Sequence, residues 1–187
     1  MGASLAIQYA ASRVKTVKTY IISPVLAGLV LLSPVLRPTI HPTVREIVQY
    51  ARSLLIDPTY PSLAVAGREE LGCRDPSFNA FLKGDPLFVR FVSVRFLTNL
   101  GLWLRNTRKK GHLLRIPLLV LQGGQDHITH PGGTTAFLRH IPSKELNVIR
   151  FPQAYHSLLH DPDTPAVIKA LTAWLTDSRT FQAERNS

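Results

Sequence analysis

Two short stretches near the C-terminal end of the chain carry side chains that could do acid–base chemistry. The stretch IPLLVLQGGQDHITHPGG places Asp126 after an apolar run and two glycines, and FPQAYHSLLHDPD places His156 a few residues after a second run. A carboxylate can hold an imidazole in one tautomer and stabilise it when it becomes protonated. An imidazole held in this way can take the proton of a hydroxyl nucleophile, so the two residues form a candidate acid–base pair.

The segments around this pair alternate between strand and helix patterns. IPLLVLQ is typical of a buried strand and NVIRFP of a second strand, while TTAFLRHI, opened by Gly132 and Gly133, and TPAVIKALTAWL are typical of helices. This order predicts an α/β layer with a parallel sheet. Because ligands lie outside the carboxyl ends of parallel strands, Asp126 and His156 should project from the same sheet edge.

The N-terminal half contributes one more strand and a helical region. GASLAIQYAASR is apolar on most sides and predicts a buried helix, and AGLVLLSPVL predicts a central strand covered on both faces. From Arg37 to about Gly111 no strand pattern appears, and prolines separate helical stretches such as TVREIVQYARSLL and PLFVRFVSVRFLTNLGLWLRN. Core packing and the lining of an apolar ligand cleft both account for the large apolar side chains of this region, which are Phe78, Phe81, Phe88, Phe91, Phe96, Leu97, Leu100 and Trp103.

Composition limits the class of protein. The chain has 187 residues, of which 45% are apolar, and this is enough for one globular domain with a core. Its single cysteine, Cys73, cannot close an intramolecular disulfide, which fits a reducing compartment, and we expect a cytoplasmic protein. The net charge of +10 favours contact with anionic surfaces. The densest basic run, RNTRKKGHLLR, contains no stacking aromatic residue, so we interpret it as a solvated helix end and loop and do not expect nucleic-acid binding.

The uncharged stretch YIISPVLAGLVLLSPVL, residues 20–36, is the candidate for a targeting or membrane-spanning segment. It is short for a span and contains Pro24 and Pro34, which favours the interpretation as a buried strand. An anionic membrane surface remains a candidate partner, and the location would then be peripheral.

Four of these stretches resemble one known family. GGQDHITHPGG and FPQAYHSLLHDPD resemble the last third of a serine α/β-hydrolase of the monoacylglycerol lipase and lysophospholipase-like group. LVLLSPVL and RDPSFNAFLKGDPL also resemble that group, and the likeness extends to about Leu175. The resemblance implies that Asp126 is the catalytic acid and His156 the catalytic base, that no cofactor or metal is needed, and that the substrate is a small lipid or other carboxylic ester.

The same resemblance implies a division of the chain into four parts. Residues 1–36 would be the helix of the nucleophile elbow and the following core strand, and residues 37–112 a helical cap insertion. Residues 113–177 would be the C-terminal α/β core that carries the acid and the histidine, and residues 178–187 a tail.

The family places its nucleophile in a G-x-S-x-G turn, commonly G-x-S-M-G-[GA]. This chain begins MGASLAIQYAA, so it resembles the family from the residue after that serine, with Met1 and Gly2 at the elbow and the Met1 N–H in the position of an oxyanion donor. The nucleophile and the N-terminal strands are then absent, and we expect the chain alone to be inactive. We do not expect another serine to replace the nucleophile: Ser4 lacks the second glycine of an elbow, Ser33 precedes Pro34 at a strand end, and Ser157 adjoins His156 and should point away from it.

Three other interpretations were weighed against the hydrolase. HSLLH has the spacing of a zinc helix but lacks the glutamate of H-E-x-x-H, so we expect no metal site, and His130 and His160 read as exposed loop residues. A non-catalytic module that binds an apolar ligand stays open, and so does a basic peripheral membrane protein. A serine codon in frame just upstream of Met1 would favour the hydrolase, and loss of liposome binding when residues 20–36 are made polar would favour the membrane protein.

Overall fold

A computed structural model describes residues 2–13, 26–39, 43–61, 63–64 and 69–177. Along the chain, the helices and strands are α1 (Gly2–Arg13), β1 (Leu29–Leu32), α2 (Val44–Ile56), β2 (Leu63–Ala64), α3 (Pro76–Gly84), β3 (Phe91–Val92), α4 (Val94–Arg108), β4 (Leu118–Gly123), α5 (Pro131–Leu138), β5 (Leu146–Phe151) and α6 (Thr164–Thr176). Two short 3₁₀ turns, η1 (Glu69–Leu71) and η2 (Gly111–Leu113), complete the described elements.

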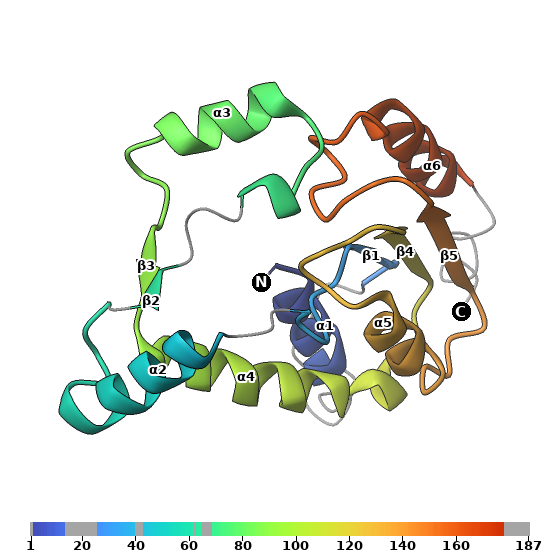
Figure 1. The fold of residues 1–187 in the computed structure, drawn as a ribbon. Coiled ribbons are helices and arrows are strands. Elements are labelled where there is room, and N and C mark those ends of the chain that lie inside the picture. Colours follow the sequence, from blue (N-terminus) through green and yellow to red (C-terminus); the bar gives the residue numbers. More distant parts are fainter. Residues whose placement is uncertain (1, 14–25, 40–42, 62, 65–68, 178–187) are drawn as a thin grey trace.

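The main sheet is parallel, as the sequence predicts. Its strand order is β1-β4-β5, with β4 in the middle (Figure 1). In the register, Val120 on β4 lies beside Leu31 on one side and Val148 on the other. Every residue of β4 is buried, because the strand is paired on both edges and covered on both faces.

Successive residues of β4 point to opposite faces of the sheet and join two separate cores. Leu118 and Val120 pack with Ile7 of α1 and Phe137 of α5, and Leu119 and Leu121 pack on the other face in a cluster that includes Val167 and Trp174 of α6. The helix predicted to be buried, α1, therefore covers one face of the sheet, and the amphipathic helix α6 covers the opposite face.

The region between β1 and β4 differs from prediction in two ways. The helix predicted to begin at Pro86 begins only at Val94, where the Ser93 hydroxyl caps it by accepting the Phe96 N–H at 3.2 Å. The expectation that this region holds no strand is also wrong, because β2 and β3 pair as an antiparallel ladder. Strands of two residues are too short to leave a periodic signal in the sequence.

Two further boundaries shift by a few residues. The strand predicted over residues 27–36 is shorter, since β1 ends at Leu32 and the chain turns at Ser33, which has a φ of 39°. The helix predicted to follow the glycine pair begins before it, at Pro131, because the His130 side chain accepts the Gly132 N–H and caps α5 there.

Helix α2 lies away from the two cores. The side chains and backbones of Thr43 and Glu46 form a capping box at its start, and the Tyr50 hydroxyl lies 2.6 Å from that of Thr98 on α4. None of its residues is buried. Several of its apolar side chains are largely exposed, namely Val44, Ile47, Val48, Leu54, Leu55 and Ile56.

None of the helices described is long and apolar enough to cross a membrane. Most of the uncharged stretch before β1, residues 20–25, lies outside the described residues.

Candidate active site at the carboxyl edge of the sheet

The loop after β4 holds the Asp126 carboxylate in a fixed orientation. One of its oxygens, Oδ1, accepts the backbone N–H groups of Ile128 at 2.9 Å and Thr129 at 2.8 Å. The other, Oδ2, accepts the Nε2 amide of Gln122 at 3.2 Å. The side chain of Asp126 is fully buried, so these bonds replace the water that the carboxylate loses on folding.

The loop after β5 brings His156 to this carboxylate. The Nδ1 atom of His156 lies 2.9 Å from Oδ2 of Asp126, although the two residues are 30 apart in the chain. A carboxylate accepts hydrogen bonds and does not donate them, which places the imidazole proton on Nδ1. The second ring nitrogen, Nε2, then carries a lone pair and can accept a proton. The His156 side chain is 22% exposed, so it is reachable from outside the core.

Glycine at the end of β4 permits the close approach of these two loops. A methyl group on Gly123 would lie 2.3 Å from the backbone oxygen of Tyr155 and 2.7 Å from that of Ala154. At Gly124 it would lie 2.5 Å from the backbone oxygen of Pro152. The loop that carries His156 therefore packs directly on the end of the strand that leads to Asp126.

We expect Gly123→Ala to lower the free energy of unfolding by about 3 kcal/mol, because backbone atoms must shift to accept the methyl group. Urea denaturation followed by circular dichroism measures this change. Gly101→Ala is the matched control: Gly101 lies inside α4 with open space around it, and alanine there should raise stability by about 1 kcal/mol. Equal effects of the two substitutions would contradict the packing argument.

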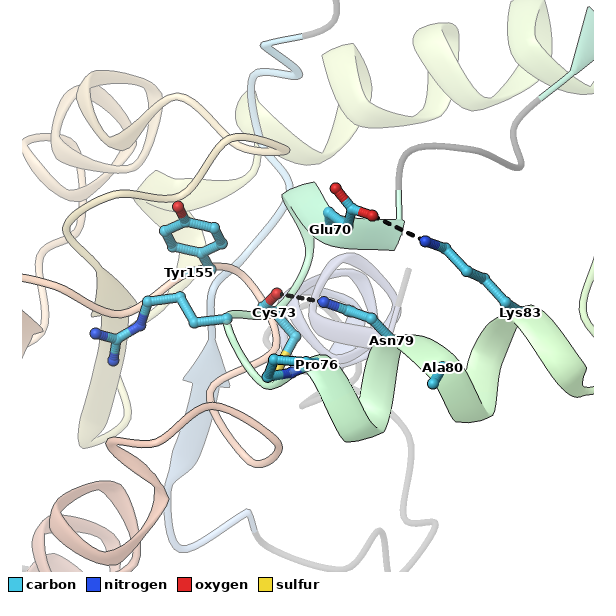
Figure 2. Close-up of a pocket in the computed structure, with 8 residues that line it drawn as sticks. Glu70, Cys73, Pro76, Asn79, Ala80, Lys83 and Tyr155 are labelled. Atoms are coloured by element: carbon cyan, nitrogen blue, oxygen red, sulfur yellow. Dashed lines mark hydrogen bonds and ion pairs between the residues drawn. The ribbon is translucent and has the colours of Figure 1, made fainter.

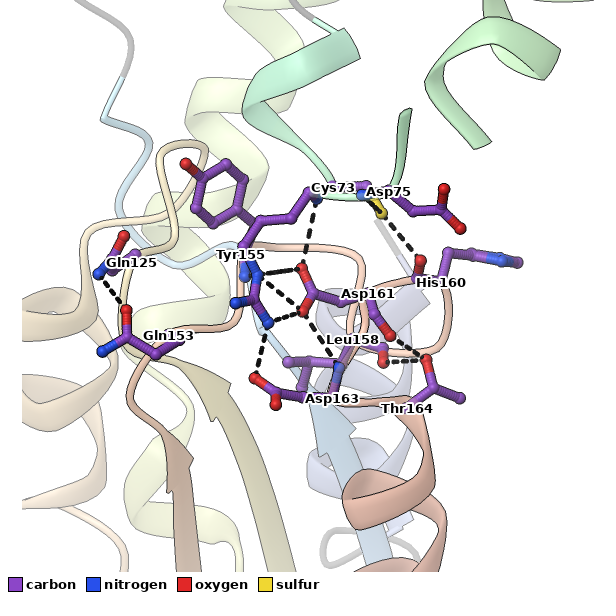
Figure 3. A network of polar contacts seen from close by, with 11 residues as sticks. Cys73, Asp75, Gln125, Gln153, Tyr155, Leu158, His160, Asp161, Asp163 and Thr164 are labelled. Atoms are coloured by element: carbon purple, nitrogen blue, oxygen red, sulfur yellow. Dashed lines mark hydrogen bonds and ion pairs between the residues drawn. The ribbon is translucent and has the colours of Figure 1, made fainter. Parts of the chain in front are cut away.

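A partly buried ion pair joins the loop of His156 to the connection between β1 and β4, with the Asp161 side chain fully buried and the Arg74 side chain 28% exposed. The Arg74 guanidinium donates to both oxygens of Asp161 through Nε, at 3.1 and 3.2 Å, and also through Nη2. Its Nη2 group reaches Asp163 as well, at 2.8 Å. Asp161 further accepts the Tyr155 N–H at 3.2 Å, so it connects the ion pair to the residue before His156 (Figure 3).

Three more contacts connect the segment 72–78 with the same loop. The Ser157 N–H donates to the backbone oxygen of Gly72 at 2.8 Å, and the Cys73 thiol donates to that of His160 at 2.9 Å. The rings of Phe78 and His160 stack with centroids 4.0 Å apart. We refer to this set of contacts, together with the Arg74–Asp161 ion pair, as the 72–78 clamp.

The contacts of the clamp shift the pKa values of Asp161, Arg74 and Cys73. Burial alone would raise the pKa of the Asp161 carboxyl, but the Arg74 hydrogen bonds and several backbone N–H groups outweigh it and hold the pKa below its usual value. The Asp161 hydrogen bond in turn raises the pKa of Arg74. Burial raises the pKa of the Cys73 thiol, which keeps the thiol protonated as the donor to His160.

A cavity of about 430 Å³ opens beside the clamp, between α3 and Tyr155 (Figure 2). Asn79 lies on its wall and donates through Nδ2 to the Cys73 backbone oxygen at 2.9 Å. Lys83 and Glu70 form an exposed ion pair at 2.8 Å along another part of the lining. The cavity thus adjoins the residue before His156 and carries both polar and charged groups.

No hydrogen bond between described residues joins Gly2, Ser4, Ser33 or Ser157 to this pair. Met1 is outside the described residues, and Gly2 is the first residue of α1. Ser4 is buried and its hydroxyl donates to Val35 at 3.4 Å, while Ser33 is buried at the turn after β1. The Ser157 side chain has no described hydrogen bond to His156.

The other histidines have separate roles. His130 caps α5, His160 stacks on Phe78, and His127 meets Tyr155 edge to face. Within the described parts of the chain, no group of three or more His, Cys, Asp or Glu side chains is placed to hold a metal ion.

The parallel sheet with helices on both faces, and an aspartate and a histidine meeting at its carboxyl edge, define part of an α/β-hydrolase. The profile of the serine aminopeptidase S33 family matches residues 1–163. The chain belongs to this family of α/β-hydrolases, and its similarities lie within the monoacylglycerol lipase-like group.

Two individual relatives are similar to this chain over part of their own length. The chain is 26% identical over 106 residues to a monoacylglycerol lipase of Mycolicibacterium smegmatis, covering 54% of this chain and 37% of the relative. It is 25% identical over 197 residues to a putative monoglyceride lipase of Schizosaccharomyces pombe, covering all of this chain and 50% of the relative.

Two crystal structures show the same fold at low identity. The monoacylglycerol lipase of Paleococcus ferrophilus superposes with a TM-score of 0.75 at 22% identity, over 92% of this chain and 64% of that one. A soluble variant of the Saccharomyces cerevisiae monoglyceride lipase gives 0.67 at 19% identity, over 93% of this chain and 58% of that one. The chain therefore spans half or less of the two curated relatives and less than two thirds of these two structures.

Proposed function

We propose that this chain is the C-terminal part of a serine hydrolase that cleaves carboxylic esters of lipids such as monoacylglycerols or lysophospholipids. The observation that carries the proposal is the 2.9 Å contact between His156 Nδ1 and Asp126 Oδ2 at the carboxyl edge of the sheet. Membership of a family whose similar members are named as lipases supports the reaction class.

In the proposed mechanism, a serine encoded directly upstream of Met1 attacks the acyl carbon of the ester. His156 Nε2 takes the proton from the serine hydroxyl, and the buried Asp126 carboxylate stabilises the imidazolium that forms. His156 then gives this proton to the leaving alcohol, and an acyl-enzyme remains. A water molecule, deprotonated by the same imidazole, then attacks the acyl carbon; the bond from that carbon to the serine oxygen breaks, and the imidazolium returns its proton to the serine as the acid leaves. Met1 and Gly2 would form the elbow after the serine, with the Met1 N–H directed at the oxyanion.

The connection between β1 and β4 would supply the surface for the acyl chain and act as the cap. Several of its large apolar side chains are exposed: Leu55 is 86%, Leu87 is 87% and Phe81 is 66% accessible. Burying such side chains against a hydrocarbon chain is favourable by about 25 cal/mol for each Å² removed from water. This exposure favours an acyl-chain surface over the alternative that these residues form a closed core.

The test compares two forms of the protein: the 187-residue chain and the longest form that the gene encodes in frame. We expect a serine codon in a G-x-S context directly before Met1, hydrolysis of a p-nitrophenyl ester by the longer form, and labelling of that serine by a fluorophosphonate. The 187-residue chain should show neither hydrolysis nor labelling. Unrelated sequence or a stop codon upstream would overturn the proposal.

The exposed apolar surface also favours a second candidate, a module that binds an apolar ligand without hydrolysing it. This alternative predicts that the chain binds a fluorescent fatty-acid analogue with no turnover, and that changing His156 leaves the binding unchanged. In that case the family fold would serve binding alone.

A further inference from the structure

A second cavity, of about 770 Å³, lies between the C-terminal end of α4 and α5. Neither Asp126 nor His156 belongs to its lining. Six of its lining residues are basic or histidine, and none is acidic; the six are Arg37, Arg105, Arg108, Lys109, His112 and His140. Residues of the basic run RNTRKKGHLLR thus meet Arg37 and His140, two residues from distant parts of the chain, around one cavity.

No positive charge of this cavity is in an ion pair with a described acidic residue. The ion pairs described involve Arg74, Lys83 and His156, and none involves a residue of this lining. Arg108 donates to the backbone oxygen of Leu36, which is a neutral acceptor. Four permanent cations around one cavity repel each other, and an anion bound between them would remove that repulsion.

The lining residues indicate what kind of anion the cavity can bind. The N–H groups at the start of α5 are already used, since Gly132 donates to His130 Nδ1 at 3.0 Å and Gly133 to the His130 backbone oxygen at 2.8 Å. These two backbone N–H groups are therefore not free to bind a single phosphate at the start of the helix. The cavity is built instead from long, exposed side chains, which can reach several phosphates at once.

The lining lacks the exposed aromatic rings that favour nucleic acid as the occupant. Proteins that bind single strands combine positive charge with aromatic faces on which bases stack. Apart from its two imidazoles, the cavity has a single aromatic lining residue, Phe137, which is only 3% exposed and packs in the core. A base entering this cavity would find positive charge but no exposed phenyl or indole ring.

We infer that the cavity between α4 and α5 receives the phosphate headgroups of anionic phospholipids and holds the protein against a membrane surface. A membrane surface presents many phosphates with limited mobility, which matches a wide cavity with several separate cations. The net charge of +10 would bring the protein to such a surface before the cavity engages it. This inference concerns binding and does not depend on the proposed hydrolysis.

The experiment is flotation of the 187-residue chain with vesicles, because bound protein rises with the vesicles while any aggregate sinks. Vesicles of phosphatidylglycerol and phosphatidylcholine are compared with phosphatidylcholine alone. The test variant is Arg105→Gln with Lys109→Gln, two exposed positions one helical turn apart in the cavity lining. The control variant, Arg95→Gln with Lys169→Gln, removes the same charge from exposed positions outside the lining.

We expect the chain to bind the anionic vesicles only. The affinity of the test variant should be about 25-fold lower, because each basic residue near a membrane surface contributes about fivefold and two are removed. The control variant should bind nearly as tightly as the unchanged chain. Equal weakening of both variants would show that net charge and not the cavity is responsible, and would overturn the inference. So would an absence of anionic-vesicle binding, displacement by millimolar inorganic phosphate, or tighter binding of a single-stranded oligonucleotide to the same residues.

Discussion

Asp126→Asn should reduce kcat for ester hydrolysis by about 10⁴-fold in the longer, nucleophile-bearing form proposed above, which is the magnitude seen for the same change in serine proteases. The asparagine amide would donate to Nδ1 of His156, where the carboxylate now accepts. The imidazole proton would then lie on Nε2, and the lone pair that takes the serine proton in the proposed mechanism would be lost. The KM should change little, since the carboxylate is buried and does not reach the substrate. Steady-state kinetics with a p-nitrophenyl ester measures both parameters.

The control for this substitution is Gln125→Asn, in the same loop. The Gln125 amide donates to Gln153 at 2.8 Å on the exposed side, and shortening it should leave kcat within about twofold, as is usual for surface changes. If Asp126→Asn retained a tenth or more of the activity while the fold remained intact, Asp126 would not be the partner of the catalytic base.

Arg74→Ala should lower the free energy of unfolding by about 3 kcal/mol at neutral pH. The substitution leaves the Asp161 carboxylate, whose side chain is fully buried, without its cationic partner. The backbone N–H groups of Tyr155, at 3.2 Å, and of residues 74 and 163, both at 3.4 Å, remain as donors and replace only part of that interaction. Chemical denaturation with two spectroscopic probes measures the loss.

The same loss should depend on pH with a definite sign. The folded-state pKa of Asp161 lies below its ordinary value of 3.8. The ion pair therefore contributes its full stability above about pH 4 and loses it as pH falls through the folded-state pKa. The difference between the unchanged protein and Arg74→Ala should be constant from pH 5 to 7 and should shrink below pH 4.

Lys83→Ala provides a matched control, because it also removes one cation from an ion pair with a carboxylate. That pair, with Glu70, is exposed on both sides, and its loss should cost less than about 1 kcal/mol. The double variant Arg74→Met with Asp161→Asn should recover part of the stability, since it removes the uncompensated charge. Equal losses of unfolding free energy for Arg74→Ala and Lys83→Ala would show that the Arg74–Asp161 pair stabilises the fold no more than an exposed ion pair does.

Local patterns in the sequence predicted the sheet and the two residues at its edge. The apolar run of β4 predicts a strand that is buried on both faces, and the strand–helix alternation predicts parallel pairing with β5. Parallel pairing alone brings the residues that follow both strands to one edge, and this places Asp126 near His156. The catalytic roles of the two residues rest on the family resemblance and stay a proposal.

The clamp was not predicted, for a physical reason. Arg74 and Asp161 are 87 residues apart, and a charged residue at either position reads locally as an exposed loop residue. In the sequence, RDPSF and HDPD share only an Asp-Pro pair next to a basic residue or histidine, and this does not show that Arg74 and Asp161 are partners. The antiparallel pair β2–β3 was missed because two residues show no alternation, and the start of α4 was missed because the apolar residues of β3 continue the helical pattern backwards.

The clamp restricts how the region between β1 and β4 can move. Segment 72–78 cannot move away from the sheet edge without breaking a partly buried ion pair, a thiol hydrogen bond and a ring stack, so it should stay fixed when the rest of the region moves. Movement of this region is then expected upstream of the segment, in α2, because α2 has no buried side chain to resist a displacement. The protein could then change shape at α2 while His156 keeps its 2.9 Å contact with Asp126.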